Sequence, residues 1–413
     1  MTNTGIAILV FLVALVMSMV MYPRVLWFAK THNIVDNPNA RKLQRVPVPV
    51  MGGLVVFSGI VCGCLVLQAF VSEPLVSWGL GGMAVMLVLG MWDDIKSLPA
   101  TLRFLLEVVL ISVMIWQTDI YIDDFHGLWG IHRLEPWVAY LVSLVIGVGI
   151  INAVNLIDGV DGYSSGYCML ASVCFAILFA SVWSQVMVCM AIIVTGALLP
   201  FFMHNVFGVR TKMFIGDGGT LMLGMLMVLF AFYSLSSKSH CAELEAEGVS
   251  LTALSLAVMC IPGFDTLRVM LMRVFRGKSP FTADKTHMHH LFIDMGFSHL
   301  GAAVSILLLN LMVVLAWLLA WQLGASIDMQ TYVVMALGAL VTFGFYKLMK
   351  VQQNSGPLDD EGYPQGTALW HWMCKLGWWS HREKGRVWRG LRWLMDSGVL
   401  SGRREIRVKN FEF

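Results

Sequence analysis

Long runs of apolar residues, separated by short polar segments, are the feature that most limits what this chain can fold into. A helix that crosses the hydrocarbon core of a bilayer needs about 20 mostly apolar residues. Only 13% of the 413 residues are charged, whereas a soluble domain carries roughly 25%. The sequence therefore predicts an all-α, polytopic membrane helix bundle. We expect about 11 transmembrane helices, near residues 5–28, 48–70, 77–92, 102–118, 136–155, 163–183, 185–203, 218–235, 249–271, 298–323 and 330–350.

The composition also excludes several other classes of protein. The formal net charge of +2 is too small for a nucleic-acid-binding protein that works through bulk charge, and the abundant apolar surface excludes intrinsic disorder. The eight cysteines do not suggest a disulfide framework, because most of them lie inside apolar runs, where cysteine acts as a small hydrophobe. The first apolar run is too long for the core of a signal peptide, so we interpret it as a retained helix.

The distribution of basic residues orients the predicted helices. If successive loops alternate between the two sides, one side receives nearly all of the lysines and arginines, and the other receives only Arg133 and Lys238. Cytoplasmic loops are enriched in lysine and arginine. We therefore expect a multi-pass protein of the inner (plasma) membrane, with its N-terminus on the periplasmic or outer side and its C-terminus in the cytoplasm.

The C-terminal segment differs in composition from the rest of the chain. We therefore divide the chain into a transmembrane domain, residues 1–351, and a cytoplasmic tail rich in tryptophan and arginine, residues 352–413. Tryptophan with arginine suits a segment that lies on the anionic inner leaflet. The alternative is a small appendage that packs on the transmembrane body, and the sequence leaves both interpretations open.

Five polar clusters interrupt the apolar sequence, and all five fall on the predicted cytoplasmic side. The first covers residues 36–44, includes Lys42 and leads into Gly52-Gly53. Basic side chains beside a Gly-Gly helix start suit a phosphate, because free backbone N–H groups and the helix dipole favour anions there. The alternative for this cluster is the ordinary positive charge of a cytoplasmic loop.

The second and fourth clusters each place acids at a predicted helix end. Asp93-Asp94 closes an apolar run and is followed by Arg103, and Gly216-Asp217 opens another run. Two carboxylates at the end of a membrane helix are costly unless a metal ion, a lysine or a proton neutralises them. Glycines beside an aspartate permit close backbone approach to a phosphate or a metal, although a glycine-rich turn alone is weak evidence.

Asn155, Asp158 and Asp161 form the third cluster, at intervals of three residues. Whether they lie on a helical turn or line a bend, three oxygen-bearing side chains converge at a membrane boundary. Oxygen ligands suit Mg²⁺, which is often held by one or two carboxylates together with substrate phosphates. An EF-hand is a poor alternative, because the loop is too short and lacks the distal glutamate.

The fifth cluster is a basic, histidine-rich loop that contains Arg276, His287, His289 and His290. The His-x-His-His spacing does not match the His pair at i and i+4 that zinc commonly uses on a helix. Because arginine and lysine lie beside the histidines, an anion site is the favoured interpretation. A solvated basic loop is the alternative.

Together these clusters gather carboxylates, cations, histidines and glycine turns at one face of the membrane. The sequence shows no Ser-His-Asp pattern and no reactive cysteine setting. Phosphoryl transfer suits this set, because the protein then mainly positions charged groups and stabilises spread negative charge with metal and cations. Phosphoryl transfer by a hydrophobic protein at the membrane surface indicates two substrates, a lipid-linked phosphate and a soluble phosphorylated donor.

The clusters, in this order, resemble those of the polyprenyl-phosphate N-acetylhexosamine-1-phosphate transferase superfamily, glycosyltransferase family 4. The signatures of that family are an Asp-Asp pair, an Asn-x-x-Asp-Gly-x-Asp-Gly run, a Gly-Asp near a helix start and a His-rich cytoplasmic loop. Here they read Asp93-Asp94, Asn155-Leu-Ile-Asp158-Gly-Val-Asp161-Gly162, Gly216-Asp217 and His287-Met-His289-His290. The resemblance covers about residues 30–350.

The resemblance implies a reaction in which a polyprenyl phosphate attacks the β-phosphate of a UDP-N-acetylhexosamine. UMP leaves, and a polyprenyl-diphosphate-linked sugar forms. Residues 1–351 are then the catalytic domain, with the active site on the cytoplasmic face. The implied cofactor is Mg²⁺, with Mn²⁺ as an alternative. The implied partners are undecaprenyl phosphate, the UDP-sugar and a second copy of the chain in a homodimer, but no nucleic acid.

The family also implies roles for individual residues. Asp217 and Asp158 are expected to bind the metal. The expected catalytic residues are Asp93, Asp94, Asp158 and Asp161. Substrate binding is expected from Lys42, Arg103, Asn155, Leu156, Phe214, Arg276, His287, His289 and His290.

The His-x-His-His spacing is similar to that of bacterial GlcNAc-1-phosphate transferases of the WecA type. The branch that uses UDP-MurNAc-pentapeptide typically has a contiguous His triplet instead. The resemblance thus implies transfer of GlcNAc 1-phosphate, the step that starts O-antigen, in lipopolysaccharide biosynthesis, or another cell-surface glycan. Another UDP-N-acetylhexosamine and UDP-MurNAc-pentapeptide are alternative donors. A transporter is the alternative of a different class, with Glu107 and Asp265 as its deeper polar residues.

Overall fold

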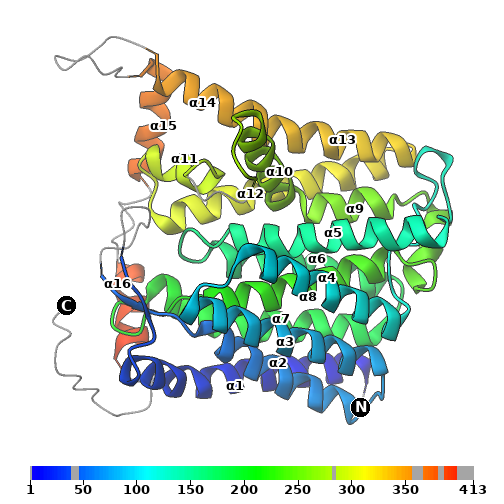
Figure 1. The fold of residues 1–413 in the computed structure, drawn as a ribbon, viewed down its shortest axis with the longest axis horizontal. Coiled ribbons are helices and arrows are strands. Elements are labelled where there is room, and N and C mark those ends of the chain that lie inside the picture. The colour runs from blue at the N-terminus through cyan, green and yellow to red at the C-terminus, as the bar shows by residue number, and fades with distance from the viewer. Residues whose placement is uncertain (1, 39–45, 281–284, 356–365, 380–385, 398–413) are drawn as a thin grey trace.

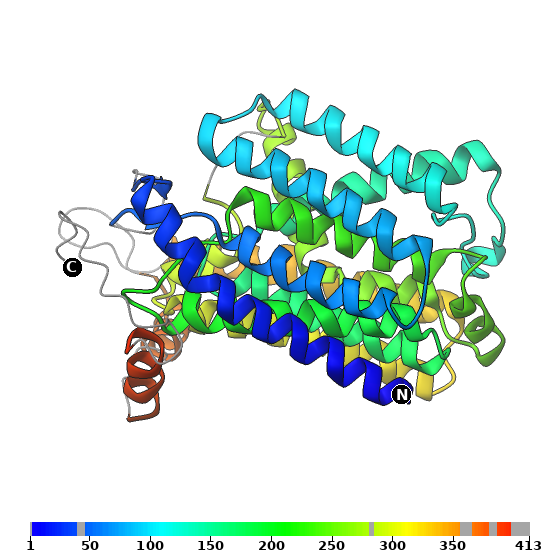
Figure 2. The same cartoon turned by 90° about the horizontal axis from the view of Figure 1, so that it is seen from below.

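The computed structural model describes residues 2–38, 46–280, 285–355, 366–379 and 386–397, and these residues are almost entirely helical. The longer helices lie side by side along the long axis of the molecule (Figures 1 and 2). They are α1 (Asn3–Thr31), α2 (Gly52–Gln68), α3 (Pro74–Lys96), α4 (Ala100–Thr118), α5 (Pro136–Leu156), α6 (Tyr163–Ser181), α7 (Gln185–Phe207), α8 (Gly216–Leu235) and α12 (His299–Gln322).

Shorter elements complete the described chain. The shorter helices are α9 (Leu251–Val258), α10 (Cys260–Phe275), α11 (Met288–Asp294), α13 (Ile327–Ala339), α14 (Tyr346–Gln353), α15 (Ala368–Trp379) and α16 (Arg386–Asp396). The 3₁₀ helices are η1 (Leu128–Gly130) and η2 (His240–Glu247), and the π turn η3 (Leu340–Phe345) joins α13 to α14. Two short strands, β1 (Val35–Asp36) and β2 (Val48–Pro49), pair in antiparallel fashion.

All of the predicted apolar runs are helical, but they differ in length. Within the described residues, nine helices are long and apolar enough to cross a membrane, and a tenth span results if α9 and α10 count as one. The run predicted at 48–70 forms α2, which is apolar but, with 17 residues, is shorter than each of the nine spanning helices. The all-helical, multi-pass character is therefore confirmed, whereas an eleventh span and the orientation in the membrane stay predictions.

The run predicted at 249–271 is not one straight helix, because α9 and α10 are bent by 73° relative to each other. Pro262 lies just after the break and has no N–H to continue the hydrogen-bond ladder. Asn310 of α12 satisfies the interrupted backbone groups: its Oδ1 accepts from the Ile261 N–H at 2.9 Å, and its Nδ2 donates to the Val258 carbonyl at 3.1 Å. Unpaired backbone groups are costly inside a membrane, so Asn310 stabilises the bend.

Helix α8 is the central element of the bundle. It packs against α2, α3 and α5, and 94% of its most apolar window is buried. A Cβ atom on Gly53 of α2 would lie 2.5 Å from the Cα of Gly219, and a Cβ on Gly90 of α3 would lie 2.4 Å from the Asp217 carbonyl oxygen. Glycine at these positions therefore allows α2 and α3 to hold the N-terminus of α8 between them.

The described parts of the tail contact the helical body at the end opposite the N-terminus (Figure 1). Trp370 of α15 is buried, and Asp396 of α16 accepts hydrogen bonds from the backbone N–H groups of Val209, Arg210 and Thr211 at 3.1 to 3.4 Å. These contacts agree with the interpretation of the tail as an appendage on the body. Trp372, Trp378 and Trp393 are nevertheless exposed, which leaves an aromatic surface on the tail.

We expect Gly90→Ala to destabilise the protein, because its Cβ would overlap the backbone at the start of α8. Overpacking of this kind costs about 1–3 kcal/mol, which thermal unfolding in detergent would detect as a lower Tm. Gly81→Ala is the matched control on the same helix, since a Cβ there has no neighbour within 4 Å. An equal effect of the two substitutions would contradict the close approach of α3 and α8.

We expect Asp396→Ala to release α16 from the loop between α7 and α8, because the carboxylate loses hydrogen bonds worth about 1.5–3 kcal/mol. Limited proteolysis followed by mass spectrometry should then show faster cleavage in the tail. Arg392→Ala is the control, since Arg392 is exposed on the same helix. Unchanged protection of the Asp396→Ala tail would show that other contacts hold α16.

Candidate active site

Asp94 lies near the C-terminus of α3, and its side chain caps the N-terminus of the neighbouring helix α8. Its Oδ1 accepts a hydrogen bond from the Asp217 N–H at 3.0 Å, and its Oδ2 accepts from the Gly218 N–H at 3.3 Å. The first N–H groups of a helix have no partner within the helix, and the helix dipole favours negative charge there. An acid at the C-terminus of α3 is disfavoured by the dipole of its own helix, and the contact with α8 offsets this cost.

Asn155, near the C-terminus of α5, fixes the Asp217 side chain. Its Nδ2 donates to Asp217 Oδ1 at 2.9 Å and to Thr220 Oγ1 at 2.8 Å. Residues from three separate helices, α3, α5 and α8, thus meet at one point. The second, third and fourth polar clusters of the sequence are therefore brought together by the fold.

Asp158 lies in the loop between α5 and α6, and its Oδ1 accepts a hydrogen bond from Ser164 Oγ at 2.6 Å. Asp158 is exposed as a residue. Desolvation by the surrounding protein nevertheless raises the pKa of its carboxyl group to about 7. The hydrogen bond from Ser164 opposes this shift, while the negative charges of Asp217, Asp161 and Asp36 add to it. Asp158 is therefore part of a group of acids close enough to repel one another.

Asp161, three residues further on, has cationic neighbours. Lys212 Nζ lies 2.6 Å from its Oδ2, and His299 Nδ1 lies 2.9 Å from the same oxygen. Burial alone would raise the pKa of Asp161, but the hydrogen bond with His299 and the charge of Lys212 bring it below its usual value. Asp161 is therefore ionised near neutral pH, and it holds Lys212 beside the site.

Asp93 pairs with the start of α4. Its Oδ1 accepts from the Leu98 N–H at 2.6 Å, and Arg103 donates to its Oδ2 at 3.3 Å. The Arg103 guanidinium also lies 3.7 Å from the buried Glu107. Adjacent acids in the sequence, Asp93 and Asp94, thus have different partners: Asp93 joins α3 to α4, and Asp94 joins α3 to α8.

The histidine-rich loop is tied to α10 and packs on the third cluster. His287 Nδ1 lies 2.9 Å from one oxygen of Asp265, whose other oxygen accepts from Arg268 at 2.7 Å. A Cβ on Gly159 would lie 2.0 Å from His289 Nε2, so glycine there admits the imidazole. Burial, together with the neighbouring histidine charges, holds the pKa of His289 well below its usual value. His289 is therefore neutral and offers a hydrogen bond rather than a positive charge.

The remaining expected site residues lie around this group. Leu156 is half-buried at the end of α5, and His290 is half-buried in α11. The Phe214 ring lies in the connection between α7 and α8, with Lys212 Nζ 5.5 Å from its centre. Arg276 is exposed at the C-terminus of α10. Lys42 lies outside the described residues.

Several residues of the site were not singled out by sequence reasoning. The missed residues are Ser164, Asn205, Lys212, Thr220 and His299, of which Asn205 accepts from the N–H of Gly162 at 2.8 Å. Only Lys212 and Thr220 carried a signal, since they lie next to the Phe214 to Asp217 segment. The others reach the site through contacts between residues far apart in the sequence.

The donor chemistry of this group fits a divalent metal. Asp217 and Asp158 supply carboxylate oxygens, which Mg²⁺ prefers, and the amide of Asn155 fixes the orientation of Asp217. The mutual repulsion of the acids around Asp158 is the kind of unfavourable charge that a divalent cation relieves. Lys212 and Arg103 supply positive charge on either side.

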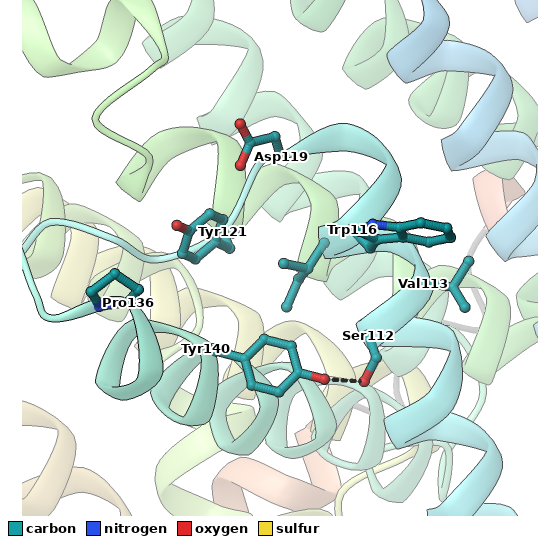
Figure 3. Close-up of a pocket in the computed structure, with 8 residues that line it drawn as sticks. Ser112, Val113, Trp116, Asp119, Tyr121, Pro136 and Tyr140 are labelled. Atoms are coloured by element: carbon teal, nitrogen blue, oxygen red, sulfur yellow. Dashed lines mark hydrogen bonds between the residues drawn. The ribbon is translucent and has the colours of Figure 1, made fainter.

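One cavity lies away from these carboxylates. It has a volume of about 550 Å³ and is lined by residues of α4, α5 and the segment between them, including Trp116, Asp119, Tyr121 and Tyr140 (Figure 3). Asp119 caps the C-terminus of α4, whereas Asp93 contacts the N-terminal part of that helix. The cavity therefore belongs to the opposite end of the bundle and is not part of the candidate active site.

Comparisons with known proteins identify relatives of this chain. The profile of glycosyl transferase family 4 matches residues 76–235. The chain is 30% identical over 305 residues to a probable undecaprenyl-phosphate N-acetylglucosaminyl 1-phosphate transferase of Bacillus subtilis, covering 73% of this chain and 82% of that protein.

Two further relatives have similar descriptions. An undecaprenyl-phosphate alpha-N-acetylglucosaminyl 1-phosphate transferase of Escherichia coli (strain K12) is 30% identical over 289 residues, which is 68% of this chain and 74% of the relative. A decaprenyl-phosphate N-acetylglucosaminephosphotransferase of Mycolicibacterium smegmatis is 28% identical over 294 residues, which is 66% of this chain and 72% of the relative.

The matched segment contains Asp94, Asp158, Asp161 and Asp217, while the histidine-rich loop lies beyond its end. Since a relative at 30% identity is also covered over most of its length, the chain belongs to glycosyl transferase family 4, the family of polyprenyl-phosphate N-acetylhexosamine-1-phosphate transferases.

Proposed function

We propose that this protein transfers GlcNAc 1-phosphate from UDP-GlcNAc to undecaprenyl phosphate and releases UMP. The observation that carries the proposal is the convergence of Asp94, Asn155 and Asp217 at the N-terminus of α8, with Asp158 close by. The relatives named for undecaprenyl-phosphate GlcNAc transfer support the choice of sugar and lipid. The product is the lipid-linked sugar on which an O-antigen or another cell-surface glycan is built.

The proposed site lies at the cytoplasmic face of the inner membrane. The loops at the end of the bundle that carries the site hold most of the basic residues, which supports a cytoplasmic location. A soluble nucleotide sugar reaches that face from the cytoplasm, and a lipid phosphate reaches it from the inner leaflet. The proposed topology has eleven spans, with α2 as the short one.

In the proposed mechanism, the chain itself mainly positions charges. A lipid phosphate monoester has a second pKa of about 6, so it is already an anionic nucleophile near neutral pH and general-base help is optional. Lys212, held by Asp161, is placed to balance the negative charge of the diphosphate. Arg103 is similarly placed from the start of α4. Neutral His289 is suited to hydrogen-bond a phosphate oxygen.

We assign Mg²⁺ to Asp217 and Asp158, since enzymes of this family are generally metal-dependent. When bound, the ion supplies charge neutralisation for the diphosphate and its leaving group. Asp94 has a distinct role in this assignment, because its two oxygens accept from the backbone of α8. We propose that Asp94 positions Asp217 through these hydrogen bonds to the backbone of α8.

A transporter is the alternative of another class, and its two deeper polar residues have partners within the bundle. Glu107 accepts from Asn152 Nδ2 at 2.5 Å, and Asp265 pairs with Arg268 and His287. Such internal pairing stabilises the bundle and disfavours a transport path through these residues. The alternative donors, another UDP-N-acetylhexosamine and UDP-MurNAc-pentapeptide, are distinguished by assaying a panel of nucleotide sugars.

We expect Asp217→Ala to abolish Mg²⁺-dependent release of UMP from UDP-GlcNAc in detergent with undecaprenyl phosphate. A fall of at least 100-fold is expected, because removing one group that stabilises transition-state charge costs about 10²–10³ in rate. Asp119→Ala is the control, since Asp119 is an exposed acid at the other end of α4. Full activity of the Asp217→Ala enzyme would exclude the assigned site.

We expect Mg²⁺ affinity to fall as the pH is lowered from 8 to 6. A proton competes with the metal for Asp158, whose pKa is raised to about 7, and ligands must be deprotonated to bind. Calorimetric titration without substrate should show a Kd about tenfold weaker at pH 6 than at pH 8. Asp158→Asn should flatten this dependence, and Asp119→Asn should preserve it. A pH-independent Kd in the wild-type protein would remove Asp158 from the metal site.

A further inference from the structure

A second group of potential metal ligands lies at the end of the bundle remote from the candidate active site. Asp124 and His132 come from the connection between α4 and α5, at the right-hand end of Figure 1, and Glu245 comes from η2, which follows α8. One ligand atom of each residue lies within 4.8 Å of the other two. Because α8 has 20 residues, this group is about 30 Å from the N-terminus of α8.

His126 provides an independent sign that the group is built for a ligand. Its side chain is only 1% exposed, and neither ring nitrogen has a hydrogen-bond partner among the described residues. Its Nδ1 nevertheless faces the acids, 3.4 Å from Glu245 Oε2 and 4.0 Å from Asp124 Oδ1. A buried imidazole without a hydrogen bond is costly, and a metal bound to Nδ1 would give that nitrogen a partner.

The local backbone brings these side chains together. Residues 123–134 form a hairpin-like turn in which the Phe125 N–H donates to the His132 carbonyl, and His126 adopts a positive φ of 53°. At the tip, a Cβ on Gly127 would lie 3.5 Å from both Glu245 Oε1 and His132 Cε1. Since φ is also positive at Gly127, this position favours glycine.

We propose that Asp124, His132 and Glu245 bind a divalent transition-metal ion, with His126 as the fourth ligand. Two carboxylates and two neutral imidazoles carry a formal charge that a divalent cation balances. Imidazole with carboxylate selects Zn²⁺ and its first-row neighbours over Mg²⁺ and Ca²⁺. The site is separate from the Mg²⁺ site assigned to Asp217 and Asp158.

The existing distances are close to those that Zn²⁺ needs. Bonds of about 2.0–2.1 Å in a tetrahedron separate neighbouring ligand atoms by about 3.3 Å. His132 Nδ1 lies 3.2 Å from Glu245 Oε1, and His126 Nδ1 lies 3.4 Å from Oε2 of the same residue. Asp124 Oδ1 lies 4.0 Å from His126 Nδ1, and the ligand atom of Asp124 lies within 4.8 Å of those of His132 and Glu245, so Asp124 would have to move closer by up to about 1.5 Å to reach this spacing.

The ion would link the connection between α4 and α5 to the η2 segment that follows α8. The hairpin-like turn already contacts its surroundings through hydrogen bonds from Ser237 to Asp123 at 2.7 Å and from the Trp129 N–H to Asp328 at 2.6 Å. A metal shared by Asp124, His132 and Glu245 would add a further attachment in the middle of the turn. It would thereby hold the far ends of α4 and α8 in a fixed relation.

Zinc binding by the full chain in detergent tests this proposal. After removal of metal with a chelator, the protein is titrated with Zn²⁺ in a calorimeter with excess Mg²⁺, in an Asp217→Asn background that weakens the other site. We expect one Zn²⁺ per chain, and a Kd weakened at least tenfold by His132→Gln or Glu245→Gln. Zn²⁺ should also raise the Tm of the parent protein and not that of these two variants.

The controls lie on the same segment. His240 and Glu243 of η2 form an exposed pair with the same two side-chain types, and His240→Gln and Glu243→Gln should leave Zn²⁺ binding unchanged. His132 is largely exposed, so its substitution does not threaten folding, and gel filtration verifies this. The proposal is overturned if the parent protein binds no Zn²⁺ in the micromolar range. It is equally overturned if His132→Gln and Glu245→Gln retain the parent affinity, which would place the zinc elsewhere, for example at the histidine-rich loop.

Discussion

The contact between the Asp94 carboxylate and the N-terminus of α8 is the interaction on which the rest of the site depends. It satisfies two N–H groups of a buried helix and places an acid from one helix against the dipole of another. The contact requires close packing, and Gly53 and Gly90 permit it because any side chain at those positions would overlap the backbone of α8. The position of Asp217, which Asn155 then holds, follows from this packing.

The site contains several neighbouring carboxyl groups, and their pKa values differ. Asp158 and Asp161 are three residues apart, yet the pKa of Asp158 is raised to about 7 and that of Asp161 is lowered. The difference arises from their neighbours, because Asp158 has other acids around it and Asp161 contacts Lys212 and His299. Asp158 thus titrates near neutral pH, while Asp161 stays ionised and holds Lys212 beside the site.

Much of this arrangement was predictable from the sequence, and the failures have physical causes. The apolar runs predicted the helices, and polar clusters at the same ends of those runs predicted that Asp94, Asn155 and Asp217 would meet. The bend between α9 and α10 was not predicted, because it depends on Asn310, which is distant in the sequence. Neither was the pairing of His287 with Asp265, which binds the histidine-rich loop to α10. Local patterns carry no information about such long-range partners.

The sequence by itself determined that this chain is a multi-pass helical membrane protein whose acidic motifs, Asp93-Asp94, Asp158 to Asp161 and Asp217, lie at one end of the bundle. It did so because a bilayer requires long apolar helices and makes each polar residue within them exceptional. Only the tertiary structure decided which acids share a partner, as Asp93 and Asp94 illustrate by contacting different helices. It also decided that three potential metal ligands, Asp124, His132 and Glu245, converge at the opposite end, with the His126 imidazole beside Glu245. The reason is that a side chain's charge and reactivity depend on neighbours supplied by other helices, and those neighbours are fixed only when the helices pack.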